Sequence, residues 1–571
     1  MPEYFFTCSI GPVQGFIAAA RSSRDLAYGS WLLSELAKTA ARTIAAQEGF
    51  DALIFPAPEN ENDLAPGSEL SVANKVVAVV RKKDPRALAE DIEEALRQYV
   101  WNAWVFIEKR LGKGVDADLA RWQLDDLIEY YWAAAPFDNV DEYRGTRDRC
   151  EAALNARKVT RDFGPYQGTP RFKSSIDGWR EHVLSRSSDY QRPPAPDLQR
   201  FKLRKGELLS GVDLLKRLGG QEASKVKRYP SVSHLAALPF AEGLGEQRAD
   251  ELKQRLIRLF QEQGAEPVRD YSVFFPSEVR AAVEKKQAVE WLLREQERLL
   301  TEYAGQRRPG SYYALLLADG DFMGKTIDAQ ETPETHRELS QALSKFAKEV
   351  PRIVARHKGV AIYSGGDDVL AYLPLHTALD CVGELAERFA QAMAGFTFTD
   401  DDGREKSPTL SAGLVIAHHL EPLSDVLALA RRTEKAAKSV PGKNTLAITL
   451  NKRSGAERTI KQKLPVLIKR LQTMTRWWLD GTLSKGTAYE LEHLARKMGD
   501  VLDRKALRVE AIRILKRKRE SGGGQGVRKE IIEKMEKWLE ELEEHDSPLG
   551  ELAQEMIIAD EFTRAMEQAQ G

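Results

Sequence analysis

The sequence has few cysteines, no long apolar segment and almost no net charge. Its three cysteines, Cys8, Cys150 and Cys381, lie far apart among 571 residues. They form neither a CxxC pair nor a disulfide framework, which is typical of a protein of the reducing cytoplasm. No apolar run reaches the ~18 residues of a membrane span, and residues 1–5 lack the basic start of a signal peptide. We therefore expect a cytoplasmic location and no membrane partner. The net charge is −1, so any contact with nucleic acid must come from local patches.

The chain does contain enough apolar and charged sequence for several globular domains. Apolar residues make up 42% and charged residues 30%, and a chain of this length typically forms about three to four domains. Short β-forming runs and helical stretches twice follow an order that is typical of a ferredoxin-like or palm-like unit. The strand candidates are residues 4–10, 52–55 and 75–80 in the first unit, and residues 312–318, 359–363, 369–373 and 409–416 in the second.

These patterns predict an α+β fold with two ferredoxin-like palm domains of the nucleotide cyclase type, a helical insert and a C-terminal helical bundle. The expected domains are a degenerate first palm at 1–114, a mainly helical middle domain at 115–306, a second palm at 307–452 and a helical domain at 453–571. The repeated order suggests a duplication, although no residue-level repeat is strong enough to prove it.

The most informative motif is Gly-Gly-Asp-Asp at residues 365–368, which lies between two strand candidates. The glycines make a tight turn, so Asp367 and Asp368 lie at the tip of a β-hairpin. The strand candidate upstream ends at Asp319. Carboxylates crowded in this way repel one another unless cations neutralise them. We therefore expect Asp319, Asp367 and Asp368 to be catalytic and to bind one or two Mg²⁺ or Mn²⁺ ions, as in palm-type nucleotidyltransferases. A solvated turn is the plainer alternative.

Small residues beside the acids predict contacts with a nucleotide. At Gly320, Ser364, Gly365 and Gly366, bare backbone can approach a ligand closely, because glycine has no side chain to block it. Asp321 is either a further acid of the site or the cap of the helix that follows, and the sequence favours neither.

Lysines and one further glycine-containing turn predict contacts with phosphates. Lys438 and Lys443 close the second unit, where they can neutralise a triphosphate. A lysine in the last turn of a helix, favoured there by the helix dipole, is equally consistent, and Lys325 is similarly ambiguous. Ser9 and Gly11 end the first strand just before a helix N-terminus. They predict a site for an anion or a second nucleotide, or only an ordinary turn.

Together the motifs resemble one known family. It is the large, palm-containing subunit of type III CRISPR effector complexes, and the chain is most similar to members from subtype III-B. The similarity is spread from residue 4 to about residue 455, and the helical tail matches only in character. The blocks that carry it are residues 9–14 (SIGPVQ), 20–26 (ARSSRDL), 207–217 (ELLSGVDLLKR), 229–233 (YPSVS), 318–324 (ADGDFMG) and 364–368 (SGGDD).

The resemblance implies an enzyme of antiviral defence that converts ATP into cyclic oligoadenylates when its complex binds target RNA. The implied partners are a guide RNA-binding subunit, a small helical subunit, the crRNA and the target RNA. A donor ATP would lie with the metal ions on the second palm, and an acceptor ATP near Ser9 and Gly11 of the first.

Two departures from the family qualify this expectation. Many relatives begin with a His-Asp nuclease domain, whereas this sequence starts directly at the first palm. Many also bind zinc through paired cysteines in the middle region, where this chain has only Cys150. We therefore expect neither cleavage of single-stranded DNA nor a zinc site.

Two other functions remain open on the sequence. A non-catalytic scaffold would bridge the other subunits, with the acids left over from an active ancestor. A free-standing cyclase would make a dinucleotide signal, since residues 411–413, 436–438 and 442–444 are similar to diguanylate cyclase domains. Against the latter, Asp368 stands where that family has a glutamate, and residues 1–305 would be unexplained.

Overall fold

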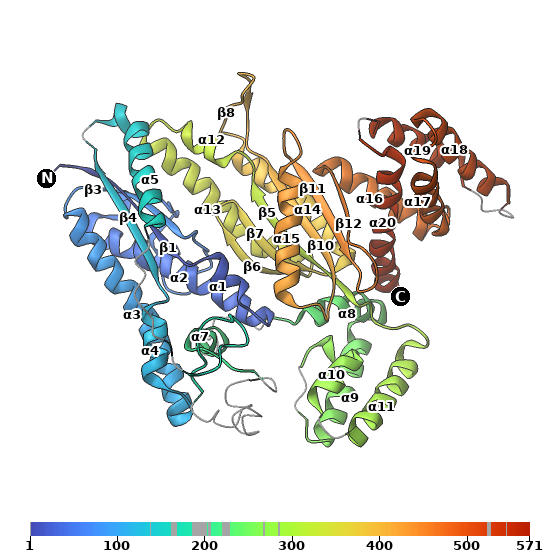
Figure 1. Cartoon of the computed structure of the whole chain (residues 1–571), viewed down its shortest axis with the longest axis horizontal. Coiled ribbons are helices and arrows are strands. Elements are labelled where there is room, and N and C mark those ends of the chain that lie inside the picture. The colour runs from blue at the N-terminus through green and yellow to red at the C-terminus, as the bar shows by residue number, and fades with distance from the viewer. Residues whose placement is uncertain are drawn as a thin grey trace.

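The computed structural model contains two β-sheets at its centre, with helices packed on their faces and a helical C-terminal region beside the second sheet (Figure 1). Among the helices of the described residues, none combines the length and apolar character that a membrane crossing requires. The structure describes residues 2–137, 139–160, 168, 170–184, 203, 207–219, 229–265, 269–283, 286–521, 527–543 and 545–571.

The first sheet is built from four antiparallel strands in the spatial order β2-β3-β1-β4. With helices α2 and α3 between the strands, this is the ferredoxin-like order. Both helices pack on the face that carries Phe6, Cys8 and Ile10, whereas α5 covers the opposite face at Phe5. The elements are β1 (Tyr4–Gly11), α2 (Ser23–Glu48), β2 (Leu53–Phe55), β3 (Lys75–Val80), α3 (Pro85–Leu111), β4 (Glu129–Pro136) and α5 (Tyr143–Val159).

Local sequence explains where the helices of this unit begin. The side chain of Ser22 accepts a hydrogen bond from the backbone N–H of Asp25 and caps α2. Asp84 caps α3 in the same way, and Pro85 follows at the first helical position, where its missing N–H costs nothing.

The first unit extends past the predicted boundary at residue 114. β4 pairs with β1 along its whole length, from Tyr4 opposite Pro136 to Gly11 opposite Glu129. The segment that was expected to open a helical domain therefore supplies the fourth strand, because the sheet needs it to cover the second edge of β1.

The second sheet repeats this arrangement and adds two strands. Its spatial order is β12-β11-β10-β5-β7-β6, and the four strands β5, β6, β7 and β10 again have the ferredoxin-like order. The elements are β5 (Tyr312–Gly320), α12 (Met323–Asp328), α13 (Pro333–Arg356), β6 (Val360–Gly365), β7 (Asp368–Leu373), α14 (Leu375–Met393), β10 (Leu410–His418), α15 (Leu423–Lys438), β11 (Thr445–Asn451) and β12 (Arg458–Lys463).

Different helices pack on the two faces of the second sheet. Leu316 and Ala318 of β5 pack with α13 and α14 in one core. Tyr313 and Leu315 point to the other face, where they pack with α15 and a helix of the middle region. Because side chains alternate along a strand, Asp319 lies on this second face, under α15.

The two units meet reciprocally along their β2 and β6 edges. Helix α13 of the second unit packs against β2, and α2 of the first unit packs against β6. Ser340 accepts a hydrogen bond from the backbone N–H of Ala57 at 2.9 Å, and Arg337 donates to the carbonyl of Leu53 at 2.9 Å. Equivalent elements thus exchange contacts, as the subunits of a two-fold symmetric dimer do.

The remaining described elements are mainly helical. Helix α8 packs on the second sheet beside α15, and α16 to α20 form the C-terminal region (Figure 1). They are α1 (Gln14–Ala18), α4 (Ala117–Asp125), α7 (Gly211–Leu218), α8 (Val232–Leu244), α9 (Glu246–Glu262), α10 (Pro276–Ala282), α11 (Lys286–Ala304), β8 (Phe398–Thr399), β9 (Glu405–Lys406), α16 (Leu464–Leu479), α17 (Gly486–Met498), α18 (Arg504–Ser521), α19 (Lys529–Glu541) and α20 (Pro548–Gln570).

A buried ionic network joins α7 to the start of α2. The Arg217 guanidinium contacts the carboxylate of Asp25 at 2.9 Å and that of Glu207 at 2.5 Å, and all three side chains are buried. Lys216 donates to the carbonyls of Phe16 and Ala19 at the end of α1. Two of the sequence blocks, 20–26 and 207–217, therefore fold against each other.

Candidate active site

Strand pairing places Asp319 opposite Asp368. In the β5–β7 pair, Leu317 faces Leu370 and Ala318 faces Val369. One further step in this antiparallel register puts Asp319 directly opposite Asp368, on the face covered by α15. Residues opposed in this way have Cβ atoms about 4.5–5.5 Å apart. The two carboxylates can therefore share a ligand.

Asp367 lies on the other side of the strand ends. The same register places it opposite Gly320, where an added Cβ would be 2.8 Å from the Asp367 Cβ and 2.9 Å from its Oδ2. Gly320 is therefore required to make room for Asp367. Within the described residues, no three His, Cys, Asp or Glu side chains lie close enough to hold a metal ion. The arrangement is a pair of carboxylates, with the third predicted acid behind it.

Lys438 and Glu434 of α15 complete this face of the site. The Lys438 ammonium forms an ion pair with Asp319 and lies 3.5 Å from the carboxylate of Glu434. Burial, reinforced by the nearby Lys443 charge, lowers the pKa of Lys438 to about 8. Glu434 was not among the predicted residues. Its spacing of four residues from Lys438, which places both on one helix face, could have indicated it.

The electrostatics of the site favour a cation. Burial raises the pKa of Asp367. Burial also raises the pKa of Asp368, and the charges of Asp367 and Glu434 raise it further. The Asp368 side chain is nevertheless exposed at the hairpin tip. Burial also raises the pKa of Glu434. Ionised carboxylates so placed need positive charge nearby, which Lys438 supplies to Asp319.

Asp321 joins the loops beside the site through hydrogen bonds. It is fully buried and accepts hydrogen bonds from the hydroxyls of Thr409 at 2.7 Å and Ser411 at 2.8 Å, and from the backbone N–H of Asn444 at 2.9 Å. No side-chain cap hydrogen bond begins α12. Of the two alternatives for Asp321, the structure supports neither a site acid nor a helix cap. It ties β5 to β10 and to the loop before β11.

The other two lysines differ in their surroundings. The Lys443 ammonium lies 4.4 Å from the centre of the Phe322 ring. The backbone of Lys443 has a positive φ of 48°, and Lys463 donates to its carbonyl at 2.5 Å. Lys443 is thereby held beside the acids. Lys325 instead forms an exposed ion pair with Asp401 at 2.6 Å.

The hairpin turn presents backbone rather than side chains. Gly366 has a φ of 68°, which favours glycine, and a Cβ on Gly365 would overlap the hydroxyl of Tyr363. The Ser364 hydroxyl points away and donates to the carbonyl of Ala347 at 3.0 Å. Phe55 of the first unit lies 3.9 Å from where a Cβ of Gly366 would be. An aromatic ring from one unit therefore borders the turn of the other.

Ser9 and Gly11 belong to the first sheet. Ser9 is buried and lies between Lys75 of β3 and Tyr131 of β4. A Cβ on Gly11 would be 3.2 Å from the Glu129 carboxylate. Within the described residues, no hydrogen bond or ion pair joins Ser9 or Gly11 to the aspartates of the second unit.

Comparisons with known proteins cover both units. Residues 312–447 match the family model "Cas10/Cmr2, second palm domain", and residues 5–105 match "CRISPR-associated protein Cmr2, N-terminal". The chain is 26% identical over 549 residues to "CRISPR system Cmr subunit Cmr2" of Pyrococcus furiosus, in a match covering 78% of this chain and 61% of the relative. A Saccharolobus solfataricus protein described as "CRISPR system CMR subunit Cmr2" is 32% identical over 108 residues, or 17% of this chain and 10% of that protein. The chain thus spans about three fifths of the length of the Pyrococcus relative.

Solved structures support the same fold. A chain of the type III-B Cmr-beta complex in its apo state superimposes with a TM-score of 0.63 at 14% identity, covering 92% of this chain and 78% of that chain. The Cmr-beta structure bound to cognate target RNA gives the same TM-score and identity, with 79% of that chain covered. These matches confirm the resemblance seen in the sequence: residues 5–105 and 312–447 are similar to the N-terminal region and the second palm domain of Cas10/Cmr2, the large subunit of type III-B complexes.

Proposed function

We propose that this chain is a nucleotidyltransferase that converts ATP into cyclic oligoadenylates when its type III-B complex binds target RNA. One observation carries the proposal. Asp319 and Asp368 oppose each other across the paired ends of β5 and β7, beside the cationic Lys438. A scaffold has no need for paired carboxylates there, whereas transfer of a nucleotidyl group needs them to hold cations against a triphosphate.

The residues present fit divalent cations. Asp319 and Asp368 offer carboxylate oxygens, the ligand type that Mg²⁺ and Mn²⁺ prefer. Such ions, when bound, would activate a 3′-hydroxyl and offset the charge of the departing pyrophosphate. Asp367 would support the pair from behind, because it packs against Gly320.

The chain's own residues would position the donor ATP. If Asp319 bound a metal ion, its ion pair with Lys438 would be released. The Lys438 ammonium would then neutralise phosphate charge, and Lys443 would add a second positive charge. The turn at Gly365 and Gly366 would let the triphosphate approach the backbone. Phe55, beside that turn, supplies an apolar surface from the first unit.

The first unit would act as a degenerate palm that presents the acceptor ATP. Its strand order is that of the second unit, and it lacks the Gly-Gly-Asp-Asp turn. The acceptor would lie near Ser9 and Gly11. The guide RNA-binding subunit, a small helical subunit, crRNA and target RNA would assemble around this chain in the cytoplasm. The Cmr-beta structure described as bound to cognate target RNA supports this assembly.

The direct test compares the chain alone with the assembled complex. Each is incubated with ATP and Mg²⁺ or Mn²⁺, with and without target RNA, and products are identified by mass spectrometry. We expect cyclic oligoadenylates only from the complex with target RNA. A cyclic dinucleotide from the chain alone would favour the free-standing cyclase, and no product under any condition would favour the scaffold.

A further inference from the structure

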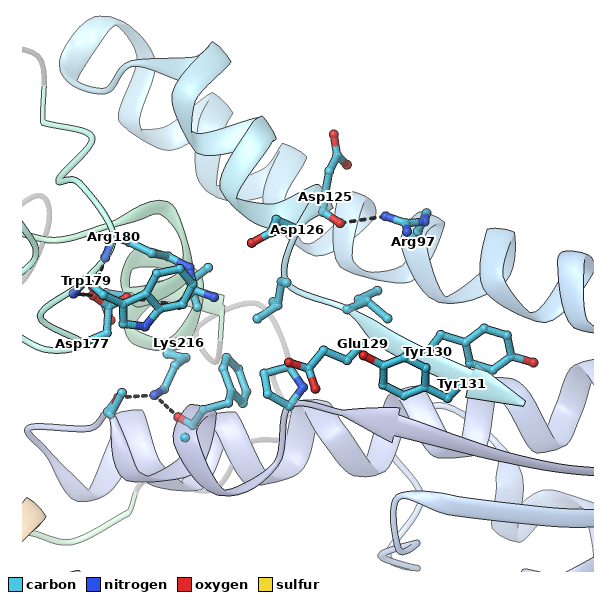
Figure 2. Close-up of a pocket in the computed structure, with 18 of the residues that line it drawn as sticks. Arg97, Asp125, Asp126, Glu129, Tyr130, Tyr131, Asp177, Trp179, Arg180 and Lys216 are labelled. Carbon is cyan, nitrogen blue, oxygen red and sulfur yellow. Dashed lines mark hydrogen bonds and ion pairs between the residues drawn. The ribbon is translucent and has the colours of Figure 1, made fainter. Parts of the chain in front are cut away.

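A large cleft lies in the first unit, away from the aspartates. Its volume is about 1170 Å³, and its walls are α1, α3, the loop after α4, the start of β4, the segment at residues 177–180 and α7 (Figure 2). No residue of the second unit lines it.

The cleft runs along an open edge of the first sheet. Within the described residues, β4 pairs only with β1, so it is an edge strand. The consecutive residues 129–132 all line the cleft. The side chains of consecutive strand residues point to opposite faces of the sheet. Residues 129–132 can therefore all line one cleft only if the cleft runs along the outer edge of β4. An open edge offers backbone N–H and C=O groups to an added strand.

An exposed tryptophan stands across the opening from β4 (Figure 2). The Trp179 side chain is 54% exposed, which is unusual for so large an apolar group. It is held firmly, because the Asp177 carboxylate accepts the backbone N–H groups of Trp179 and Arg180, both at 3.1 Å. The Arg180 guanidinium lies 3.7 Å from the centre of the indole ring. Rigid, exposed tryptophans are typical anchors of protein interfaces.

The charged side chains of the cleft disfavour the binding of nucleic acid. Three of its cationic side chains already have partners in the chain. Arg180 pairs with Asp177 at 3.1 Å, Lys216 donates to backbone carbonyls, and Arg97 pairs with Glu93 at 2.8 Å. Asp125 and Asp126, by contrast, are exposed on the rim. Phosphates would be repelled by these carboxylates, whereas guanidinium or ammonium groups would be attracted and could also stack on Trp179.

We propose that this cleft receives an extended, arginine- or lysine-bearing segment of another protein subunit, which adds a strand to β4 and packs on Trp179. Its basic side chains pair with Asp126 and its neighbours on the rim. The inference rests on the proposed assembly into an effector complex, but not on catalysis.

A photo-crosslinking experiment can identify the occupant. The full chain carrying Trp179→p-benzoylphenylalanine is purified within the complete effector complex, and co-purification of the other subunits is checked first. After irradiation, cross-linked products are sequenced by mass spectrometry. We expect a peptide of another subunit that contains arginine or lysine. The same photoreactive residue at Val140, which is exposed at the start of α5, is the background control.

A charge reversal then tests recognition by the acidic rim. In the photoreactive chain, Asp126→Lys should lower the cross-link yield at least fivefold. Asp141→Lys, a change at an exposed acid just before α5 that does not line the cleft, should leave the yield unchanged. Cross-links to crRNA or target RNA, a yield no higher than at Val140, or insensitivity to Asp126→Lys would each overturn the proposal.

These readouts are independent of the proposed enzyme activity. Cross-linking needs no ATP, so a complex that makes no cyclic oligoadenylate but gives the expected peptide would contradict only the catalytic function. Failure of the other subunits to co-purify would contradict the proposed assembly, and the cleft proposal with it.

Discussion

The two ferredoxin-like units share the order of four strands but carry different side chains at the ends of two neighbouring strands. In the second unit, Asp319 of β5 opposes Asp368 of β7 and pairs with Lys438 of α15. In the first unit, Ser9 of β1 opposes Lys75 of β3, and Lys75 pairs at 2.5 Å with Glu151 of α5. A carboxylate pair has been exchanged for a serine and a lysine.

The helices above these strand ends correspond as well. Both α5 and α15 follow the fourth strand of their unit and cover the sheet face opposite the two crossover helices. At these strand ends the second unit therefore has two opposed carboxylates, whereas the first has a buried hydroxyl and an ammonium that already pairs with Glu151. The two units thus share a strand order and differ in the few side chains at their strand ends, which is where a difference in function would lie.

Removing the carboxylate pair should have the largest effect. Asp319→Asn or Asp368→Asn should each lower product formation by about 10³-fold, because several kcal/mol of metal-dependent stabilisation are lost. Ser9→Ala should cost less than about tenfold, since no metal ligand is removed. Product is measured by mass spectrometry in the assembled complex with target RNA.

The control is Asp402→Asn, an exposed acid in the turn between β8 and β9. The double variant Asp367→Ala with Asp368→Ala should abolish product while the complex still assembles. Full activity of that double variant would contradict the mechanism, and equal losses for Asp319 and Ser9 variants would contradict the asymmetry of the units.

The next effect is expected at Lys438. Lys438→Met should reduce kcat by about 10²-fold, because a cation near the triphosphate is lost from a partly buried site. Lys435→Met on the exposed side of the same helix is the matched control. Unchanged kcat in Lys438→Met would mean that this lysine only neutralises Asp319 when no nucleotide is bound.

A glycine on β10 should control the placement of α15. A Cβ at Gly413 would lie 2.5 Å from the backbone nitrogen of Glu434 and 2.8 Å from its Cα. Gly413→Ala should therefore push α15 away, lower the free energy of unfolding by about 1–3 kcal/mol, and reduce activity with it. Gly395→Ala, where an added Cβ meets nothing within 4 Å, is the control. Chemical denaturation measures the free energy of unfolding of both variants. Equal values would show that α15 can move away from β10 without a loss of stability.

The sequence predicted the second unit well because its signals are local. Strand candidates such as 312–318 and 369–373 lie within β5 and β7, where apolar runs are bounded by glycines and acids. β4 was missed because its sequence, with three consecutive alanines, lacks the alternation of a half-buried strand.

The sequence predicted which acids form the site, and that assignment stays a prediction, whereas their geometry could not be predicted. Asp319, Asp367 and Asp368 were expected in one cluster. The register between β5 and β7 opposes Asp319 to Asp368, whereas Asp367 contacts Gly320 and its charge still raises the pKa of Asp368. A register is set by pairing across the sheet, and one residue of shift reverses every side chain. Glu434 was missed because its approach to the acids depends on tertiary packing, namely on how closely α15 lies against Gly413.

The smallest effect is expected at the junction between the units. His336 of α13 is buried, and its Nδ1 lies 2.8 Å from the hydroxyl of Tyr143 on α5. Burial, with Arg147 and Lys75 nearby, lowers the pKa of His336 to about 3. In the unfolded chain, His336 therefore takes up a proton near pH 6.5, whereas in the folded chain it stays neutral at that pH. The stability that the neutral imidazole contributes is present above pH 6.5 and is lost as the pH falls toward 3.

Between pH 7.5 and pH 5.5 this loss should amount to about 1.4 kcal/mol. His336→Gln removes the titrating group and keeps an acceptor for the Tyr143 hydroxyl. Denaturant unfolding of both proteins at the two pH values isolates the histidine, because every other titrating group is common to them. The wild type should lose about 1.4 kcal/mol more than the variant. If both lose the same, the folded chain does not lower the pKa of His336, and burial at the junction does not oppose its protonation.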